Sequence, residues 1–350
     1  MTDPIKLETL RRRYATTGGG DIYDPELRRV ADTQFQGNKR KWPFMDPATF
    51  LGAPFRPEAA TDPAASGLDI GLLGVPMDLG VTNRAGARLG PRAVRGVERI
   101  GPFEHVLRLA PLAEARVADI GDVPFRSRFS LESCHEDIEA HVARLRAGGL
   151  RVLAVGGDHS ITLPILKSTG RGQPVGMIHI DAHCDTAGEF EGSKFHHGGP
   201  FRHAVLEGVL DPDRTVQIGI RGGAEYLWEF SYESGMTVIH TEEVAARGIP
   251  DVIATARAVV GDGPVYVSFD VDSLDPAFAP GTGTPEIGGL TTREVMQLLR
   301  GLVGLDVIGG DVMEVAPQYD TTTNTAHAAA QMLFEILCLM VRSPSLPRRP

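Results

Sequence analysis

Aspartates and histidines gather where several apolar, strand-like runs of this chain end. The richest group is Asp181, His183 and Asp185, which follows the run 175–180. An extended backbone through this segment would send these three side chains to one face and the apolar residues between them to the other. The spacing therefore predicts that three metal-ligand-type side chains converge on one point.

A second acidic pair, Asp270 and Asp272, follows the run 265–269, and His159 follows the run 151–155. One acidic pair at a strand end is often a cap or a turn former, but three such groups in one chain argue for a shared site. Four carboxylates and two imidazoles suit first-row divalent ions, and bridging carboxylates suit two closely spaced ions. The histidines disfavour magnesium alone. We therefore expect a hydrolytic site with two metal ions.

The same residues carry a resemblance to a known family. Gly-Gly-Asp-His-Ser at 156–160, Asp-Ala-His-Cys-Asp at 181–185 and Ser-Phe-Asp-Val-Asp-Ser-Leu-Asp-Pro at 268–276 resemble motifs of the ureohydrolases, which include arginases, agmatinases and guanidino-acid hydrolases. The resemblance extends over about residues 68–339. It implies an α/β fold, a three-layer αβα sandwich with a mainly parallel eight-stranded sheet, and a hydrolase that acts on C–N bonds of linear amidines.

The resemblance also implies the metal ligands. One ion would be bound by His159, Asp181, Asp185 and Asp270. The second would be bound by Asp181, His183, Asp270 and Asp272. Asp181 and Asp270 would then bridge two divalent ions, for which Mn²⁺ and Ni²⁺ are our candidates. Asp158 and Asp275 are not ligands in this pattern, and we expect them to fix loops.

Three catalytic roles follow from the resemblance as well. Asp185 would hydrogen-bond the attacking hydroxide, in addition to binding metal. Glu314, after the run 307–312, matches a carboxylate that grips the substrate guanidinium through paired hydrogen bonds. His197 matches a proton-shuttling histidine, and its neighbour His196 is the competing assignment. The expected reaction is attack of a metal-bridged hydroxide on the guanidinium carbon and collapse to urea and an amine.

Several substrates fit this chemistry. Asn83 and the residues around it resemble the agmatinase side of the family, and we expect Asn83 to contact the substrate. Free arginine is not expected, because the loop after Asp185 lacks the polar residues with which arginases hold an amino acid. The loop itself is ambiguous: it has acidic side chains for a distal ammonium, as in agmatine, and basic ones for a distal carboxylate, as in guanidinobutyrate. These residues are Glu189, Glu191, Lys194 and Arg202.

The long N-terminal arm resembles a branch that hydrolyses guanidine, N-alkylguanidines and biguanides, in which some members prefer nickel and some work beside a paralogous subunit. Tyr226 and Trp228 would wall an apolar pocket for an alkylated nitrogen. Our first choice is a small guanidine, N-alkylguanidine or biguanide such as metformin, with release of urea or, from a biguanide, guanylurea. Agmatinase and guanidinobutyrase are the alternatives. A non-catalytic partner subunit and a one-zinc deacetylase are alternatives of another class, but neither needs all six ligands and Glu314.

A sheet must position these residues. Strand-like runs recur at 70–75, 117–123, 151–155, 175–180, 216–220, 237–240, 265–269 and 307–312, and helix-like segments occur at 131–147, 252–260, 292–302 and 325–341. This alternation predicts a parallel sheet with helices on both faces. Ligands of such sheets bind beyond the carboxyl ends of the strands, which is where each motif falls.

Composition sets the remaining limits. The chain of 350 residues is 42% hydrophobic, enough for one large domain, and its net charge of −10 argues against nucleic acid and anionic membranes as partners. We expect a single catalytic domain over residues 51–345. Residues 1–50 would form an arm on that domain or on a neighbouring subunit, with Trp42, Phe44 and Phe50 as anchors.

We find neither a run of about 18 apolar residues nor a signal pattern in the sequence. The three cysteines, without paired spacing, are typical of reduced thiols, and we expect a cytoplasmic protein. The resemblance implies a homo-oligomer, a trimer or a hexamer, or a hetero-oligomer with a paralogous subunit.

Overall fold

The computed structural model describes residues 3–15, 22–32, 35–36, 39–40, 44–97 and 100–347. The chain divides into two compact units, Met1–Trp42 and Pro43–Pro350. The boundary expected from the sequence lies slightly later, after residue 50. The assignment of an arm and of a single catalytic domain to these segments stays a prediction.

The described part of the first unit consists of short elements. They are α1 (Pro4–Tyr14), α2 (Pro25–Asp32) and the antiparallel pair β1 (Phe35–Gln36) and β2 (Lys39–Arg40). The Asp3 carboxylate caps α1 by accepting a hydrogen bond from the Ile5 amide at 3.0 Å. No residue of α1 is buried, so this helix forms no core of its own.

The three aromatic anchors expected near residue 50 differ from one another. Trp42 lies outside the described residues, Phe44 is largely exposed and Phe50 is fully buried. The Phe50 amide donates to the Asp119 carboxylate, and the Arg95 guanidinium lies 4.0 Å from the centre of the Phe50 ring. Phe50 is therefore part of the core of the larger unit.

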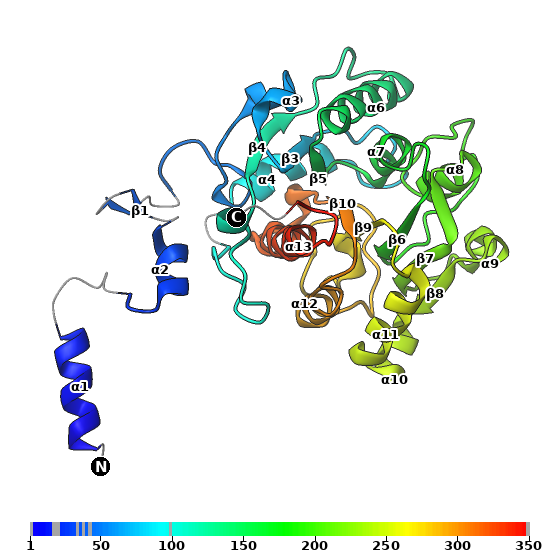
Figure 1. Ribbon diagram of the computed structural model, residues 1–350. Helices are drawn as coiled ribbons and strands as arrows, with labels where there is room; N and C mark the ends of the chain where they lie inside the picture. Colours follow the sequence, from blue (N-terminus) through cyan, green and yellow to red (C-terminus); the bar gives the residue numbers. More distant parts are fainter. Residues whose placement is uncertain are drawn as a thin grey trace. The chain divides into compact units, whose positions relative to one another are not determined.

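The larger unit is built on one eight-stranded sheet in which every neighbouring pair of strands is parallel (Figure 1). The strands are β3 (Ile70–Val75), β4 (Val117–Asp122), β5 (Arg151–Gly156), β6 (Val175–Ile180), β7 (Leu210–Ile220), β8 (Thr237–His240), β9 (Val265–Asp270) and β10 (Val307–Met313). Their order is β4-β3-β5-β10-β9-β6-β7-β8. This sheet confirms the expected architecture, and the last two strands of the chain occupy its centre.

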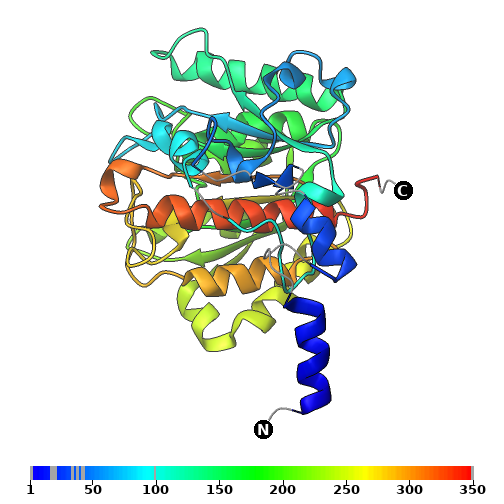
Figure 2. The same cartoon turned by 90° about the vertical axis from the view of Figure 1, so that its left-hand side faces the viewer.

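Helices cover both faces of the sheet (Figure 2). One face carries α4 (Gly90–Arg95), α10 (Thr241–Arg247), α11 (Ile249–Val260), α12 (Thr292–Gly301) and α13 (Asn324–Val341), and the other carries α6 (Leu131–Ala147), α7 (Thr162–Thr169) and α8 (Pro200–Leu206). Alternate strand residues enter two different cores, as Ile178 and Met177 of β6 do. Because both faces are buried, the strands are apolar throughout.

Shorter helical segments connect these elements. They are α3 (Pro63–Ser66), α5 (Pro111–Glu114), α9 (Glu229–Ser234) and the 3₁₀ turns η1 (Phe50–Gly52), η2 (Pro57–Ala60), η3 (Ala87–Leu89), η4 (His159–Ile161), η5 (Glu225–Leu227), η6 (Val271–Ser273) and η7 (Pro317–Tyr319). Among the long helices, α12 begins at a capping box in which Thr291 and Glu294 each bind the other's backbone amide. This capping box explains why α12 begins at Thr292, directly after the extended residue Thr291.

Helix α13 is long and apolar enough to cross a membrane, but 78% of it is buried inside the structure. It packs on β10 and α12 and supplies much of one core. We therefore regard α13 as the central helix of its layer.

Strand β7 differs most from the sequence-based expectation, since it begins at Leu210 and not at residue 216. The first part of β7 was not predicted because it contains Asp211, Pro212 and Asp213, residue types that favour turns. The pairing with β6 is irregular there, with a shift of register between Val175 and Met177. The other predicted strands match the structure to within a residue.

Candidate metal centre and active site

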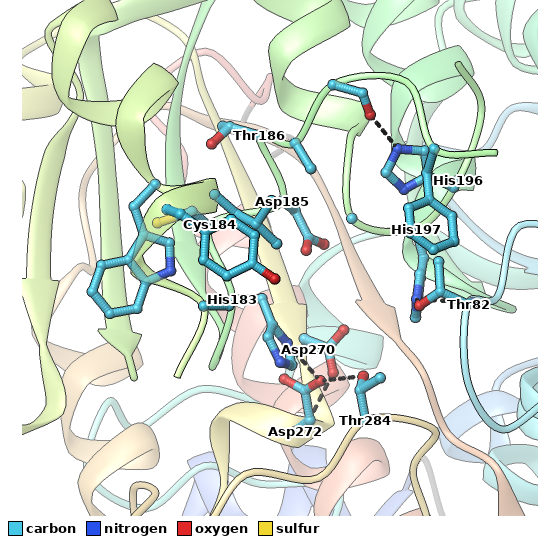
Figure 3. Close-up of a pocket in the computed structure, with 18 of the residues that line it drawn as sticks. Thr82, His183, Cys184, Asp185, Thr186, His196, His197, Asp270, Asp272 and Thr284 are labelled. Carbon is cyan, nitrogen blue, oxygen red and sulfur yellow. Dashed lines mark hydrogen bonds and ion pairs between the residues drawn. The ribbon is translucent and has the colours of Figure 1, made fainter. Parts of the chain in front are cut away.

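The motif residues follow four strands that are neighbours in the sheet, in the order β5, β10, β9 and β6. His159 follows β5, Glu314 follows β10, Asp270 ends β9 and Asp181 follows β6. Because all four strands are parallel, their carboxyl ends meet at one edge, and the motif side chains line a cavity there (Figure 3). The structure thus brings together residues that are 155 positions apart in sequence.

The first cluster surrounds the His159 imidazole. Its Nδ1 lies 3.1 Å from Asp181 Oδ2, 3.1 Å from Asp185 Oδ2 and 3.0 Å from Asp270 Oδ2. The other ring nitrogen, Nε2, donates to Ser268 Oγ at 2.8 Å, and the Ser268 hydroxyl in turn donates to Asp311 Oδ1 at 2.7 Å. This chain of hydrogen bonds fixes the tautomer in which the Nδ1 lone pair faces the three carboxylates.

The second cluster surrounds the His183 imidazole. Its Nδ1 lies 3.2 Å from Asp272 Oδ2 and 3.5 Å from Asp181 Oδ1. Asp181 therefore presents one carboxylate oxygen to each histidine. Asp270 presents Oδ2 to His159, while its Oδ1 accepts the Asp272 amide hydrogen at 2.8 Å. All six predicted ligands lie in these two clusters, and the bridging role of Asp270 stays a prediction.

The local reason for this convergence differs from the one inferred from the sequence. The extended backbone expected through Asp181–Asp185 is wrong, because β6 ends at Ile180 and the segment curls into a bend. The Asp181 carboxylate stabilises the bend by accepting the His183 amide hydrogen at 2.7 Å. Asp185 has a φ of +52°, a left-handed conformation that is uncommon outside glycine. A turn, and not strand alternation, aims these side chains at one point.

The charge of the site indicates what it holds. Burial and the repulsion of neighbouring carboxylates raise the pKa of Asp270 well above its usual value and that of Asp272 to about 6. His159 Nδ1 is buried and has no hydrogen-bond partner, although it faces three carboxylate oxygens. Such an arrangement becomes favourable when cations lie between the groups. The clustered residues therefore fit divalent metal ions.

Sequence reasoning missed the residues that support these ligands. His179 donates from Nε2 to Asp181 Oδ2 at 2.7 Å, because Gln217 donates to its Nδ1. Asp311 accepts from Ser268, and also from Thr162 and Tyr266. His179 had a signal, since it lies on β6 two residues before Asp181, directly ahead of the ligand motif. Ser268 and Asp311 lie in the motif stretches 268–276 and 311–314, but their link to His159 could not be inferred, because His159 is distant in sequence.

Glu314 and His197 form a pair beside the metal-ligand clusters. Glu314 Oε1 accepts the His159 amide hydrogen and a hydrogen bond from His197 Nδ1, both at 2.9 Å. Glu314 Oε2 is buried and has no partner. The φ of Glu314 is +64°, so its side chain is held in place by a strained backbone. On the other side of the ring, His197 Nε2 lies 2.6 Å from Thr82 Oγ1.

The cavity has a volume of about 370 Å³. Its charged and titratable lining residues are His183, Asp185, Glu189, His196, His197, Asp270, Asp272 and Glu314. An apolar wall is formed by Phe190, Tyr226, Leu227 and Trp228. Cys184 packs with Ile220 and Trp228, and burial raises the pKa of its thiol to about 12, which fits a packing residue.

The remaining predicted site residues have other contacts. The Asn83 side-chain amide donates to the Gly283 carbonyl at 3.1 Å, and its contact with substrate stays a prediction. His196 Nε2 bonds the Gly188 carbonyl at 2.6 Å, in the direction away from His197 (Figure 3). Asp158 accepts the amide hydrogens of Gly80 and Ser160.

Asp275 also binds backbone rather than a metal-ligand cluster. Its carboxylate accepts the amide hydrogens of Ala277, Gly288 and Gly289. These bonds lower the pKa of Asp275. Like Asp158, it fixes a loop.

A layered αβα fold with this site at the carboxyl edge of its sheet defines a hydrolase of the ureohydrolase type. The chain belongs to the arginase family, whose model matches residues 68–339. It is accordingly an amidinohydrolase, an enzyme that cleaves C–N bonds of guanidino-type compounds.

Three relatives place the chain within the family. It is 52% identical to a guanidinopropionase of Pseudomonas aeruginosa, over 84% of this chain and 93% of the relative. It is 44% identical to a mitochondrial agmatinase of Gallus gallus, over 79% and 82%. Among solved structures, the proclavaminate amidino hydrolase from Streptomyces clavuligerus has a TM-score of 0.81 and 35% identity, covering 87% of this chain and all of that one. These similarities support the agmatinase-like side of the family.

Proposed function

We propose that this enzyme uses two divalent ions, Mn²⁺ or Ni²⁺, to release urea from a small guanidino compound whose substituent carries no carboxylate. The six clustered side chains would hold the ions, since carboxylate oxygens and imidazoles suit both metals. When bound, such ions supply a water of lowered pKa as the nucleophile. The Asp185 carboxylate lines the cavity and would accept a hydrogen bond from that water.

The free oxygen of Glu314 is the observation that carries the proposal. A buried carboxylate oxygen without a partner is costly unless a ligand satisfies it. A guanidinium is the matching ligand, because it is always charged and offers planar pairs of N–H donors. Glu314 would thus orient the guanidinium carbon beside the metal-ligand clusters.

The lining of the cavity supports a substituent without a carboxylate. Among the residues that the structure describes, no lysine or arginine lines it. Arg202 donates to the Thr186 carbonyl and its guanidinium lies over the Phe230 ring, while the Lys194 ammonium lies over the Phe195 ring. An N-alkylguanidine or a biguanide such as metformin would place its methyl groups on the apolar wall that contains Trp228. From a biguanide the product would be guanylurea.

Two other substrates have specific support. Glu189 at the cavity would attract the distal ammonium of agmatine. The 52% identity to a guanidinopropionase favours a guanidino acid, including guanidinobutyrate. A non-catalytic partner subunit is the alternative of another class, and the complete set of six ligands disfavours it.

The test is product release from a panel of substrates. Protein loaded with Mn²⁺ or Ni²⁺ would be given guanidine, dimethylguanidine, metformin, agmatine, 3-guanidinopropionate and 4-guanidinobutyrate, and urea and guanylurea would be measured. We expect kcat/KM to be highest for an alkylated guanidine or biguanide. The Glu314→Gln variant should lose roughly 100- to 1000-fold in kcat/KM. A preference for a guanidino acid would contradict the proposal that the substituent carries no carboxylate. If the metal-loaded protein turned over none of these compounds, the proposal that it hydrolyses small guanidino compounds would be wrong.

We also propose that the protein works in the cytoplasm as an oligomer, either of identical subunits or with a paralogous subunit. All three cysteines are free and buried, which supports a reducing compartment. Light scattering of the purified protein gives the number of subunits.

A further inference from the structure

Gln217 is a polar residue inside a buried strand. It lies on β7 between the apolar residues Val216 and Ile218, and it is fully buried. In the sheet Gln217 pairs directly with His179 of β6, which is fully buried as well. This pairing places the two polar side chains on one face of the sheet, where they meet. The lining of the cavity includes neither residue, so Gln217 is not placed to touch a substrate.

The hydrogen bonds of the Gln217 side-chain amide fix its orientation. Its Nε2 donates to the Cys184 carbonyl at 2.6 Å. A carbonyl only accepts, so the amide nitrogen and not the amide oxygen lies on this side, and its second hydrogen points to His179 Nδ1 at 3.1 Å. Gln217 Oε1 is buried and has no partner, which costs roughly 1–3 kcal/mol. An apolar residue would avoid this cost, which indicates that the two donors serve a purpose.

These bonds determine which nitrogen of the His179 ring carries hydrogen. Nδ1 accepts from Gln217, so the hydrogen lies on Nε2, which donates to Asp181 Oδ2 at 2.7 Å. In the other tautomer, two N–H groups would face each other at 3.1 Å and a nitrogen lone pair would face the carboxylate at 2.7 Å. Gln217 therefore selects the tautomer that binds Asp181.

Each oxygen of the Asp181 carboxylate then accepts one hydrogen bond from the protein. Oδ2 accepts from His179, and Oδ1 accepts the His183 amide hydrogen at 2.7 Å. A carboxylate oxygen has two lone-pair sites, so each oxygen keeps one for a metal ion. Because Oδ2 lies near His159 Nδ1 and Oδ1 lies near His183 Nδ1, the carboxylate is held in the orientation that serves both clusters.

We propose that Gln217 is a positioning residue for the metal centre that acts on two ligands at once. Through His179 it holds the Asp181 carboxylate in the orientation shared by the two clusters. Through the Cys184 carbonyl it holds the peptide that leads into Asp185, the ligand with the left-handed backbone. This inference rests on the two-ion site of the proposed function.

Metal binding to purified, metal-free protein tests this role. Gln217→Met roughly keeps the size of the side chain and removes both donors. We expect it to bind Mn²⁺ about 10- to 100-fold more weakly than wild type, because that is the usual effect of removing an outer-shell partner. Gln297→Met makes the same change at an exposed position of α12 and should bind Mn²⁺ as wild type does. A Gln217→Met affinity within about twofold of wild type would overturn the proposal.

A second background separates positioning from packing. His179→Gln replaces the ring by an amide that can donate to Asp181 and has no tautomer to select. In this background Gln217→Met should weaken Mn²⁺ binding clearly less than it does in the wild-type background. An equal loss in both backgrounds would show that His179 does not transmit the effect, and the proposal would be wrong.

The ¹⁵N shifts of the His179 ring test the tautomer in metal-free wild type, without any change at Gln217. We expect the signals of a ring that carries hydrogen on Nε2 only, assigned by their absence from His179→Gln. A hydrogen on Nδ1 would overturn the role of Gln217 and leave the proposed function intact. Wild-type protein that binds neither Mn²⁺ nor Ni²⁺ would overturn the two-ion site, and both proposals with it.

Discussion

Asp181 lies between two imidazoles, with one carboxylate oxygen near each. Asp272, in contrast, lies near His183 only, at 3.2 Å. If the two clusters hold one ion each, the two aspartates have unequal importance. Asp181 contributes to both ions and Asp272 mainly to one.

We therefore expect Asp181→Asn to lose both ions and Asp272→Asn to keep one. Metal content after gel filtration, measured by mass spectrometry of the metals, checks this. The loss of affinity should exceed the roughly 10- to 100-fold that removal of an outer-shell partner causes. Asp275→Asn is the matched control, because Asp275 binds only backbone amides, and it should retain both ions. Equal metal content in Asp181→Asn and Asp272→Asn would contradict the shared position of Asp181.

The pair of His197 and Glu314 should make stability depend on pH. The pKa of His197 is raised to about 9 in the folded protein, against roughly 6.5 in the unfolded chain. A raised pKa stabilises the fold below about pH 6.5, and this contribution disappears as the pH rises through about 9. It amounts to about 3 kcal/mol at most.

Urea unfolding of metal-free protein at pH 6 and pH 9.5 measures this contribution. Wild type should exceed His197→Gln in unfolding free energy more strongly at pH 6 than at pH 9.5. In a Glu314→Gln background the difference between the two pH values should largely vanish, because the Glu314 charge is its main cause. A difference that is unchanged in that background would place the cause elsewhere.

At this scale the sequence predicted which side chains meet but not how. The six ligands could be identified because their residue types and motif spacing are specific. The turn at Asp181 and the left-handed Asp185 could not, since a polar segment after a strand can continue or bend. Thr82 also escaped prediction, because its partner His197 is 115 positions away and nothing local marks the contact.

Among the elements, the ends of β7 and η6 are joined by one buried side chain. Arg221, directly after β7, donates to the carbonyls of Gly219, Ser273, Asp272, Leu274 and Glu286. Its Nη2 reaches Asp272 O at 2.7 Å and Glu286 O at 2.7 Å. Arg221 thus fixes the turn that aims Asp272 and places Glu286 3.8 Å from His183.

We expect Arg221→Met to lose about 3 to 5 kcal/mol of unfolding free energy, because several buried carbonyls lose their donor. The ion near Asp272 should also bind more weakly. Urea unfolding and metal titration check the two effects. Arg221→Lys should lie between, since lysine keeps the charge but not the fork of donors. Arg257→Met is the control, because that guanidinium is exposed, and it should lose less.

The elements themselves were largely predictable. Strands buried on both faces are short apolar runs with clear ends, and β6 and β8 match their expected bounds. The first part of β7 was not predictable, because its residues are typical of turns. It becomes a strand through its pairing with β6, which the local sequence does not show. The strand order could not be read from periodicity, which describes each element separately. The family resemblance implied the layers and the eight mainly parallel strands, but the strand order was seen only in the structure.

For the whole molecule, the division into two units leads to a prediction about truncation. The sheet and both large cores lie in Pro43–Pro350. We expect a chain without residues 1–42 to unfold cooperatively, with Tm lowered by no more than about 2 °C, or roughly 1 kcal/mol. Calorimetry checks this. A truncated chain that fails to fold would show that the arm completes the core.

Light scattering of the same truncated chain locates the arm. A lower oligomer mass would place it on a neighbouring subunit, and an unchanged mass would place it on its own domain.

The position of β9 and β10 has a consequence for biosynthesis. These strands are translated after the other six of the sheet, yet they lie between β5 and β6, and they carry Asp270, Asp272 and Glu314 to the site. A nascent chain still short of residue 265 has the outer strands of the sheet but no middle to join them. Metal binding at both clusters therefore requires that the chain has been synthesised at least through β9, and a chain that stops before residue 265 should have no activity.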